Sequence, residues 1–274
     1  MKIGVAVRSM GEASRKETLL AAVRWAESAG IDDIWLQDHL AIPPDDAEGS
    51  QGRYLDPLTT LAWLAGKTER IGLGAGVLVL PYRRALPTAK SIATVQELSE
   101  GRLLLGVGVG WMQAEFNALG ISRAHRGRDT DRVLDLMRRA FSAPDDVIEE
   151  HGQKLLFRPK PAAPPIYIGG KGLHALKRTV RYGDGWMPMG ADPAQLKPEI
   201  EKLAELAEAA GRPCPDVVCL GGLPLDDVAS ARDQLRSLSE IGVTHFVAGG
   251  GRYTSLEEFK PLVDGVSAIR TALG

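Results

Sequence analysis

The pattern of apolar positions is most distinctive between residues 70 and 84. Residues 71–80 are all apolar or glycine and have no polar face, which is typical of a strand covered on both sides, as in a parallel sheet. Glycine occupies alternate positions over residues 72–76 of this run and over residues 106–110 of a second apolar run at 103–110, so part of one face of each strand is bare. The glycines concerned are Gly72, Gly74, Gly76, Gly106, Gly108 and Gly110.

Such bare faces are unfavourable for a strand. An interior glycine weakens a strand by about 0.5–1 kcal/mol relative to alanine. The glycines therefore predict that another backbone, a bulky neighbour or a ligand approaches closely. Interlocking with large barrel-lining side chains would explain the lower glycines of each strand, whereas Gly76 and Gly110 are the preferred functional positions.

Apolar runs alternate with amphipathic stretches along the whole chain. Each of eight runs with the character of a strand is followed by a stretch with the helical period. The expected strands lie within residues 2–7, 33–37, 70–84, 102–109, 166–170, 185–189, 217–220 and 245–248. Strict alternation with eight strands predicts an α/β fold, a closed (β/α)8 TIM barrel, as a single domain over residues 1–274. Ser14 is expected to cap the first helix, which Gly30 closes.

Two connections depart from this rhythm. A long irregular loop follows the second strand and begins with Asp38 and His39, and loops of this length in compact domains are usually functional or disordered. The connection after the fourth strand is enlarged, and we interpret residues 112–164 as an insertion. It includes a possible hairpin at 147–157 that turns at His151 and Gly152.

Composition and charge limit the kinds of partner that the protein is expected to bind. The 274 residues include 33 basic and 35 acidic side chains, a net charge of -2, so nothing favours nucleic acid or an anionic membrane. No apolar stretch of ~18 residues and no signal-peptide pattern occur, so we expect a cytoplasmic protein that binds a small molecule. Cys214 and Cys219 are not part of a CxxC motif and are expected to be free thiols.

The strand ends predicted to face the active site are rich in glycine and poor in acids. The sequence has no HExxH, P-loop or GxSxG motif, so metalloprotease, nucleotide hydrolase and serine hydrolase functions lack their residues, and no metal site is expected. A flat cofactor fits such a surface better.

Five segments together carry a family resemblance. Residues 34–39 (IWLQDH), 70–77 (RIGLGAGV), 98–103 (LSEGRL), 106–111 (GVGVGW) and 183–186 (GDGW) resemble the bacterial luciferase-like family, and most closely its branch that uses the deazaflavin coenzyme F420. The likeness runs from the first to the sixth strand, and beyond about residue 213 only the rhythm matches. It implies a flavin or deazaflavin across the barrel mouth, often against a non-prolyl cis peptide after strand three, and a homodimer.

On this resemblance, His39 is the candidate catalytic residue, as proton donor or hydrogen-bond partner at the reacting centre. Gly169 and Gly170 precede a helix whose free N–H groups suit a phosphate, with Lys171 adding charge. The candidate cofactor-binding residues are Asp38, Gly76, Val77, Gly108, Gly110, Trp111, Gly169, Gly170 and Lys171.

Several of these residues also have purely structural interpretations. Asp38 can cap the following segment and His39 can be a satisfied interior imidazole. Trp35 and Trp186 are expected in the core. A group of arginines, by default a solvated face, is a candidate track for the acidic tail of F420. They are Arg83, Arg84, Arg123, Arg126 and Arg128.

The resemblance implies an F420-dependent oxidoreductase that transfers a hydride between the deazaflavin and a small organic substrate. Trp111 stands where similar sugar-phosphate dehydrogenases have a glutamate, which disfavours a sugar phosphate and favours an apolar or aromatic substrate. The alternatives are an FMN-dependent luciferase-like monooxygenase and a non-catalytic flavin- or deazaflavin-binding protein. F420 is the expected cofactor, with FMN as the alternative.

Overall fold

The structure, a computed structural model that describes residues 1–249 and 251–273, is built around a closed barrel of eight parallel strands. Their order around the barrel is β1-β10-β9-β8-β7-β4-β3-β2, which confirms the (β/α)8 TIM barrel. The barrel strands are β1 (Lys2–Ala6), β2 (Asp33–Leu36), β3 (Gly72–Val79), β4 (Leu103–Gly108), β7 (Ile166–Gly169), β8 (Gly185–Met187), β9 (Asp216–Gly221) and β10 (His245–Ala248).

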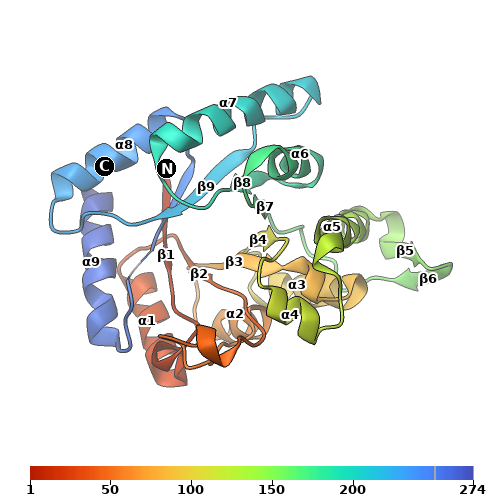
Figure 1. Cartoon of the computed structure of the whole chain (residues 1–274), viewed down its shortest axis with the longest axis horizontal. Helices are drawn as coiled ribbons and strands as arrows, with labels where there is room; N and C mark the ends of the chain where they lie inside the picture. The colour runs from red at the N-terminus through yellow and green to blue at the C-terminus, as the bar shows by residue number, and fades with distance from the viewer. Residues whose placement is uncertain (250, 274) are drawn as a thin grey trace.

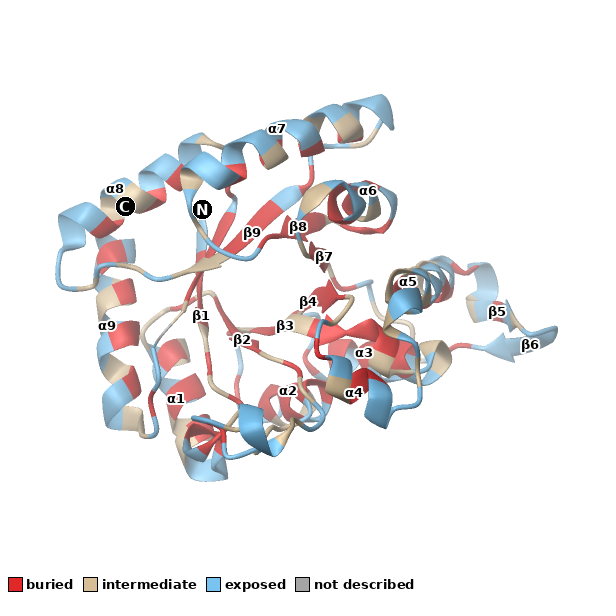
Figure 2. Cartoon of the chain, in the orientation of Figure 1, coloured by how far each residue is buried: buried red, intermediate tan, exposed pale blue. Residues whose placement is uncertain are grey.

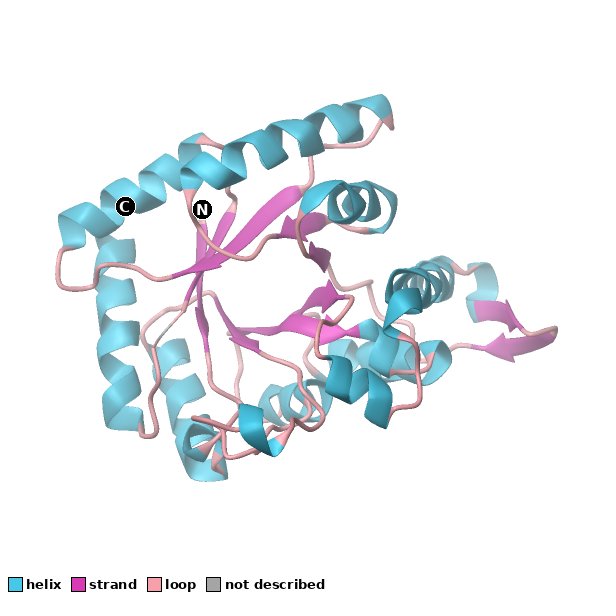
Figure 3. Cartoon of the chain, viewed as in Figure 1, coloured by secondary structure: helices cyan, strands magenta, loops and turns pink. Residues whose placement is uncertain are grey.

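Helices surround the ring of strands and turn their apolar faces toward it (Figures 2 and 3). They are α1 (Lys16–Ser28), α2 (Pro57–Ala65), α3 (Ala85–Leu98), α4 (Gln113–Ala118), α5 (Arg126–Ser142), α6 (Gly172–Tyr182), α7 (Pro193–Ala209), α8 (Val228–Glu240) and α9 (Leu256–Leu273). Short 3-10 helices add η1 (Glu12–Ser14), η2 (Pro44–Asp46), η3 (Leu80–Tyr82), η4 (Arg123–His125) and η5 (Pro144–Asp146). No helix in the described part of the chain is long and apolar enough to cross a membrane.

The first helix is capped differently from the expectation. Ser14 belongs to η1, where its hydroxyl donates to the Gly11 carbonyl at 2.6 Å and accepts from Arg53 Nε at 2.8 Å. Arg15 precedes α1 and gives no side-chain cap, so the prediction for Ser14 was wrong. The hydroxyl is used instead to hold the loop between β2 and α2.

The enlarged connection after β4 contains the predicted hairpin. Strands β5 (Val147–Glu150) and β6 (Gln153–Leu156) pair antiparallel and turn at His151 and Gly152, both with positive φ. The hairpin is separate from the barrel sheet and extends outward beyond α5 (Figure 1).

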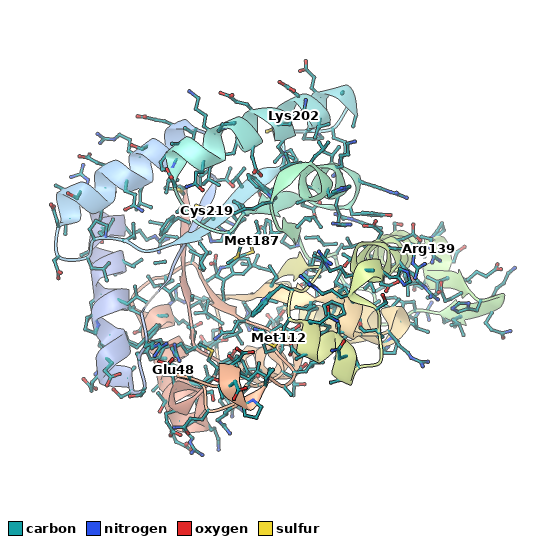
Figure 4. The ribbon with its side chains drawn as sticks, in the orientation of Figure 1. Glu48, Met112, Arg139, Met187, Lys202 and Cys219 are labelled. Atoms are coloured by element: carbon teal, nitrogen blue, oxygen red, sulfur yellow. The ribbon has the colours of Figure 1, made fainter. Side chains whose placement is uncertain are left out.

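Side chains fill the inside of the barrel as a cluster of their own, distinct from the larger core between the barrel and the helices. Its buried members are Trp35, Tyr167, Met187, Val218 and Val247. Figure 4 labels Met187 in the middle of the ring of strands. Trp35 is 2% exposed, and Trp186 in the outer core is fully buried, so both tryptophans are core residues as expected.

The glycine-bare faces of β3 and β4 make room for this interior cluster. A Cβ at Gly74 would lie 2.4 Å from Trp35 Cδ2, and one at Gly106 would lie 2.9 Å from Met187 Sδ. At the lower end, a Cβ at Gly72 would lie 2.8 Å from the Asp33 Cβ. The lower glycines therefore interlock with large interior side chains, as the sequence predicted.

Below Trp35 the barrel holds a buried polar group. Asp33 Oδ1 accepts from the Trp35 indole nitrogen at 2.6 Å and lies 3.0 Å from His245 Nε2. Asp33 and His245 are each at most 3% exposed. Gly4 is required beside it, because a Cβ there would lie 1.9 Å from Asp33 Oδ1. The pair orients the indole that fills the bare face of β3.

We predict that Gly74→Ala lowers the free energy of unfolding by about 1–3 kcal/mol, the usual cost of overpacking a core. The new methyl group would lie against both the Trp35 ring and the Ile34 carbonyl, 2.9 Å away, and a backbone atom cannot move aside cheaply. Gly222→Ala is the matched control, because nothing lies within 4 Å of its Cβ position. Urea denaturation of the two variants measures the difference, and equal stability would contradict the packing account.

Candidate functional site

Asp38, directly after β2, is buried and fully engaged. Its Oδ2 accepts from the Val79 N–H at 2.8 Å and from Arg83 Nη1 at 2.6 Å, and its Oδ1 accepts from Arg83 Nη2 at 3.0 Å. A bidentate arginine–carboxylate pair is strong and fixes geometry. Asp38 therefore ties the end of β2 to the end of β3, and its direct role toward a cofactor stays a prediction.

Arg83 links this pair to a neighbouring helix. Its Nη2 also donates to Asp56 Oδ2 at 2.9 Å, and Asp56 caps α2 through the Thr59 N–H at 2.8 Å. Burial alone would lower the pKa of Arg83, but the Asp38 and Asp56 carboxylates outweigh it and raise that pKa. Arg83 is thus committed inside the protein, and it does not lie free as the expected tail-binding track requires.

His39 is held by a buried carboxylate that the sequence analysis did not single out. Its Nδ1 lies 2.9 Å from Glu115 Oε2, and Glu115, in α4, is 3% exposed. The other Glu115 oxygen accepts from the backbone N–H groups of Leu40 at 2.6 Å and Ala41 at 3.3 Å. Since a carboxylate only accepts hydrogen bonds, His39 Nδ1 carries the hydrogen in its bond to Glu115 Oε2.

The second nitrogen of His39 has a different environment. In the described part of the chain, Nε2 has no hydrogen-bond partner, and the side chain stays 19% exposed. The Tyr54 ring lies 5.0 Å from the imidazole, and the Trp111 ring lies 6.0 Å away in an edge arrangement. The imidazole therefore has one orientation, and its Nε2 is free between two aromatic rings. This nitrogen can accept or donate one proton at the mouth, which is the end of the barrel where the strands have their C-terminal ends.

The predicted cofactor residues of β3, β4 and β7 meet at one point. The Gly76–Val77 peptide is cis, as expected, and the register of β3 against β4 shifts between Ala75 and Leu78. The Val77 side chain fills the space over two other predicted residues, because a Cβ at Gly108 would lie 2.6 Å and one at Gly169 3.0 Å from its methyl groups. These two glycines therefore make room for Val77.

Gly110 and Trp111 shape the loop after β4. Gly110 has φ +75°, and a Cβ there would lie 2.7 Å from Val79 Cγ1, so glycine is required on two counts. Trp111 follows it and is 66% exposed. Large apolar side chains rarely stay this exposed without a use when several gather. Others follow strand ends at the same rim, namely Leu40, Leu173 and Met189.

The start of α6, predicted to receive a phosphate, already has an acidic neighbour. Lys171 is exposed at the N-cap position, but the Gly172 N–H donates to Glu199 Oε2 of α7 at 3.1 Å. The Gly170 carbonyl accepts from Trp186 Nε1 at 2.9 Å, and the Gly170 N–H donates to the Met187 carbonyl at 3.3 Å. A phosphate at this helix start has to displace the Glu199 carboxylate.

The remaining arginines of the expected track lie in the α4–α5 connection and at the start of α3. Arg126 Nη1 donates to the Arg123 carbonyl at 3.1 Å, and Arg128 lies 3.4 Å from Asp129 in an exposed pair. Arg84 is exposed at the start of α3. These side chains, unlike Arg83, have no buried carboxylate partner in the described structure.

Comparison with known proteins agrees with this geometry. The model of the family described as luciferase-like monooxygenase matches residues 1–269. The chain belongs to this family. Its sequence is 30% identical over 258 residues to 5,10-methylenetetrahydromethanopterin reductase of Archaeoglobus fulgidus, covering 92% of this chain and 72% of the relative.

Solved structures share the fold at lower identity. An F420-dependent secondary alcohol dehydrogenase in complex with an F420–acetone adduct superposes with a TM-score of 0.75 at 19% identity, over 97% of this chain and 98% of the other. The oxygenating constituent of 3,6-diketocamphane monooxygenase from Pseudomonas putida, in complex with FMN, gives 0.77 at 15% identity, over 98% and 96%. The family is therefore established, and the choice of cofactor is not decided by these likenesses.

We predict a distinct acid response for Asp56→Asn. Burial would raise the pKa of Asp56, but the Thr59 N–H and Arg83 outweigh it, so the folded pKa is lowered. A lowered folded pKa contributes stability above the unfolded value of about 3.9, and this contribution is lost as the pH falls through the folded value. Asparagine keeps the cap and loses only the charge.

The variant is therefore expected to be less stable than the parent by about 1 kcal/mol or less at pH 7. The difference should begin to shrink as the pH falls below about 3.9 and should vanish once the pH is below the folded pKa of Asp56. Urea denaturation between acidic and neutral pH measures the gap, and a gap that stays constant down to the lowest pH would refute the ion-pair account.

Proposed function

We propose that the protein is an F420-dependent oxidoreductase that transfers a hydride between the deazaflavin and a small apolar or aromatic molecule. The observation that carries this proposal is the oriented His39 imidazole, whose Nδ1 is held by Glu115 and whose Nε2 is free beside Trp111. The 30% identity to an archaeal 5,10-methylenetetrahydromethanopterin reductase supports the same reaction class. When bound, the cofactor would supply the hydride, and the protein supplies position and the proton.

The residues at the mouth suit a flat ring system. Exposed apolar side chains surround glycine backbone there, and a Cβ at Gly190 or Gly222 would meet nothing within 4 Å. In our proposal the ring lies over the Gly76–Val77 peptide and the Val77 side chain, which covers Gly108, and beside the loop that begins at Gly110. Trp111 and Leu40 border the substrate, which favours an apolar molecule over a sugar phosphate.

The second candidate is an FMN-dependent monooxygenase. The fold likeness to the FMN complex of 3,6-diketocamphane monooxygenase is as extensive as that to the F420 enzyme. Both cofactors carry a phosphate, so the Gly169–Lys171 segment serves either one. The acidic tail of F420 distinguishes them, because it needs cations beyond the phosphate site.

A binding experiment with matched variants separates the phosphate from the tail. Glu199→Gln should tighten binding of FMN and F420 alike, because it removes a carboxylate from the Gly172 N–H that a phosphate would use. Neutralising Arg126 and Arg128 together should weaken only the binding of F420 that carries its acidic tail, and the loss should be greatest at low salt.

Fluorescence titration at low and high ionic strength gives each affinity. Equal affinities of the Gln variant and the parent would place the phosphate elsewhere. Micromolar FMN binding without F420 binding would replace the deazaflavin proposal by the monooxygenase.

A pair of substitutions tests whether turnover needs both nitrogens of the His39 imidazole. His39→Asn keeps an amide donor near the Nδ1 position for Glu115, and His39→Gln places an amide near the Nε2 position instead. We expect both variants to bind F420 and to lose turnover by about tenfold or more, equivalent to about 1.4 kcal/mol. Turnover is followed as oxidation of reduced F420 with a panel of enones, nitro compounds and imines. If the Asn variant turns over like the parent, His39 has only a structural role.

The homodimer and the cytoplasmic location expected from the sequence remain predictions. Light scattering of the purified protein tests the first. A non-catalytic binding protein would bind cofactor and show no oxidation of reduced F420 with any member of the panel.

A further inference from the structure

A chain of hydrogen bonds leads from His39 through Glu115 to Tyr82. His39 Nδ1 bonds Glu115 Oε2 at 2.9 Å, and the same oxygen accepts from the Tyr82 hydroxyl at 2.9 Å. The Glu115 side chain is 1% exposed. The carboxylate therefore lies buried between an imidazole on one side and a phenol on the other.

The phenol borders a separate groove on the outside of the barrel. This groove of about 700 Å³ lies between η3 with the start of α3, the α4–α5 connection, α5 and the β5–β6 hairpin. Its lining includes the apolar residues Pro81, Leu119 and Ile121 and the polar residues Arg132 and His151. Tyr82 lines the groove and also contacts Glu115, so one side chain belongs to both features.

We propose that Tyr82 and Glu115 form a proton relay that connects His39 to water in this groove. The proposal rests on the proposed function, in which His39 Nε2 exchanges a proton with the substrate. A cofactor and a substrate bound over the mouth would cover Nε2 and keep water away from it. The relay gives the imidazole a second connection to solvent through Nδ1, on the other side of the ring.

The proton balance is simple. A proton taken up at Nε2 makes an imidazolium, which releases its Nδ1 proton to Glu115 Oε2. Glu115 passes a proton to the Tyr82 oxygen while the Tyr82 hydroxyl releases its own proton to water in the groove. The imidazole is then neutral, the carboxylate is again ionised, and one proton has left. Delivery of a proton to the substrate follows the same steps in reverse.

The other contacts of Glu115 do not provide this path. Its Oε1 accepts from the amide N–H groups of Leu40 and Ala41, which do not exchange protons with a carboxylate as a hydroxyl does. Burial, followed by the Glu115 hydrogen bond and charge, raises the pKa of Tyr82, so its hydroxyl stays protonated and neutral at physiological pH. Within the described structure, Tyr82 is the only side-chain hydroxyl bonded to Glu115.

The test measures exchange of the His39 Nδ1 proton with water in the cofactor-free protein. The chain has five histidines, so 15N-histidine labelling gives few signals, and His39→Gln identifies the one that belongs to His39. A proton that passes from Nδ1 to Glu115 returns to Nδ1 unless Glu115 has an outlet. Magnetisation transfer from water therefore reports on the outlet directly, without a substrate or a bound cofactor.

Tyr82→Phe should slow this exchange by about tenfold or more, because local opening then remains as the only route. Tyr54→Phe is the matched control, since its ring packs 5.0 Å from the imidazole and has no bond to Glu115, and it should exchange like the parent. Thermal unfolding of each variant checks that the fold is intact.

Exchange in Tyr82→Phe at the parent rate, or faster, would overturn the relay. An equal slowing in Tyr54→Phe would also overturn it, because packing around His39 would then control exchange. Since no cofactor is present, neither result depends on whether F420 or FMN binds.

Discussion

Two buried carboxylates hold the loop after β2, and the site depends on them. Asp38 bonds the Val79 N–H and the Arg83 guanidinium, which fixes the loop to β3. Glu115 accepts from His39 and from the next two backbone N–H groups, which fixes the same loop to α4. Both buried carboxylates are hydrogen-bonded through both of their oxygens, and Asp38 is also paired with an arginine. The adjacent residues Asp38 and His39 are thereby anchored to different elements, and the His39 imidazole has one orientation.

The glycine-bare faces of β3 and β4 serve this arrangement from below. Trp35 fills the space over Gly74, and the Asp33–His245 pair orients its indole from the bottom of the barrel. Higher up, Val77 fills the space over Gly108 and Gly169. The barrel interior is thus closed with apolar side chains up to the level of the Gly76–Val77 peptide. In the proposed site, a ligand at this end of the barrel would therefore lie above this packing.

The sequence predicted the barrel well because eight apolar runs and their helical partners are local, periodic signals. It also predicted the cis peptide and the hairpin, since family position and turn residues carry both. It missed Glu115 because a single acid in a short helix has no motif of its own. Its partners His39, Leu40 and Tyr82 lie 33 to 76 residues away along the chain, so no local pattern marks Glu115 as buried. The ion pairs of Arg83 and the contact of Glu199 with the start of α6 depend on tertiary contacts between distant elements. The periodicity of apolar residues does not predict such contacts.

The position of the acid also bears on the chemistry. A glutamate directly after the strand-four glycines would present its carboxyl group to the substrate. Here Trp111 takes that place, and the nearby acid, Glu115, lies four residues later in α4. Its side chain is 1% exposed and accepts from four donors of the protein. In the proposed reaction, this acid would act on the substrate only through His39. This separates the two tasks of the site, because Trp111 can offer an apolar surface to the substrate while the buried carboxylate keeps the imidazole oriented.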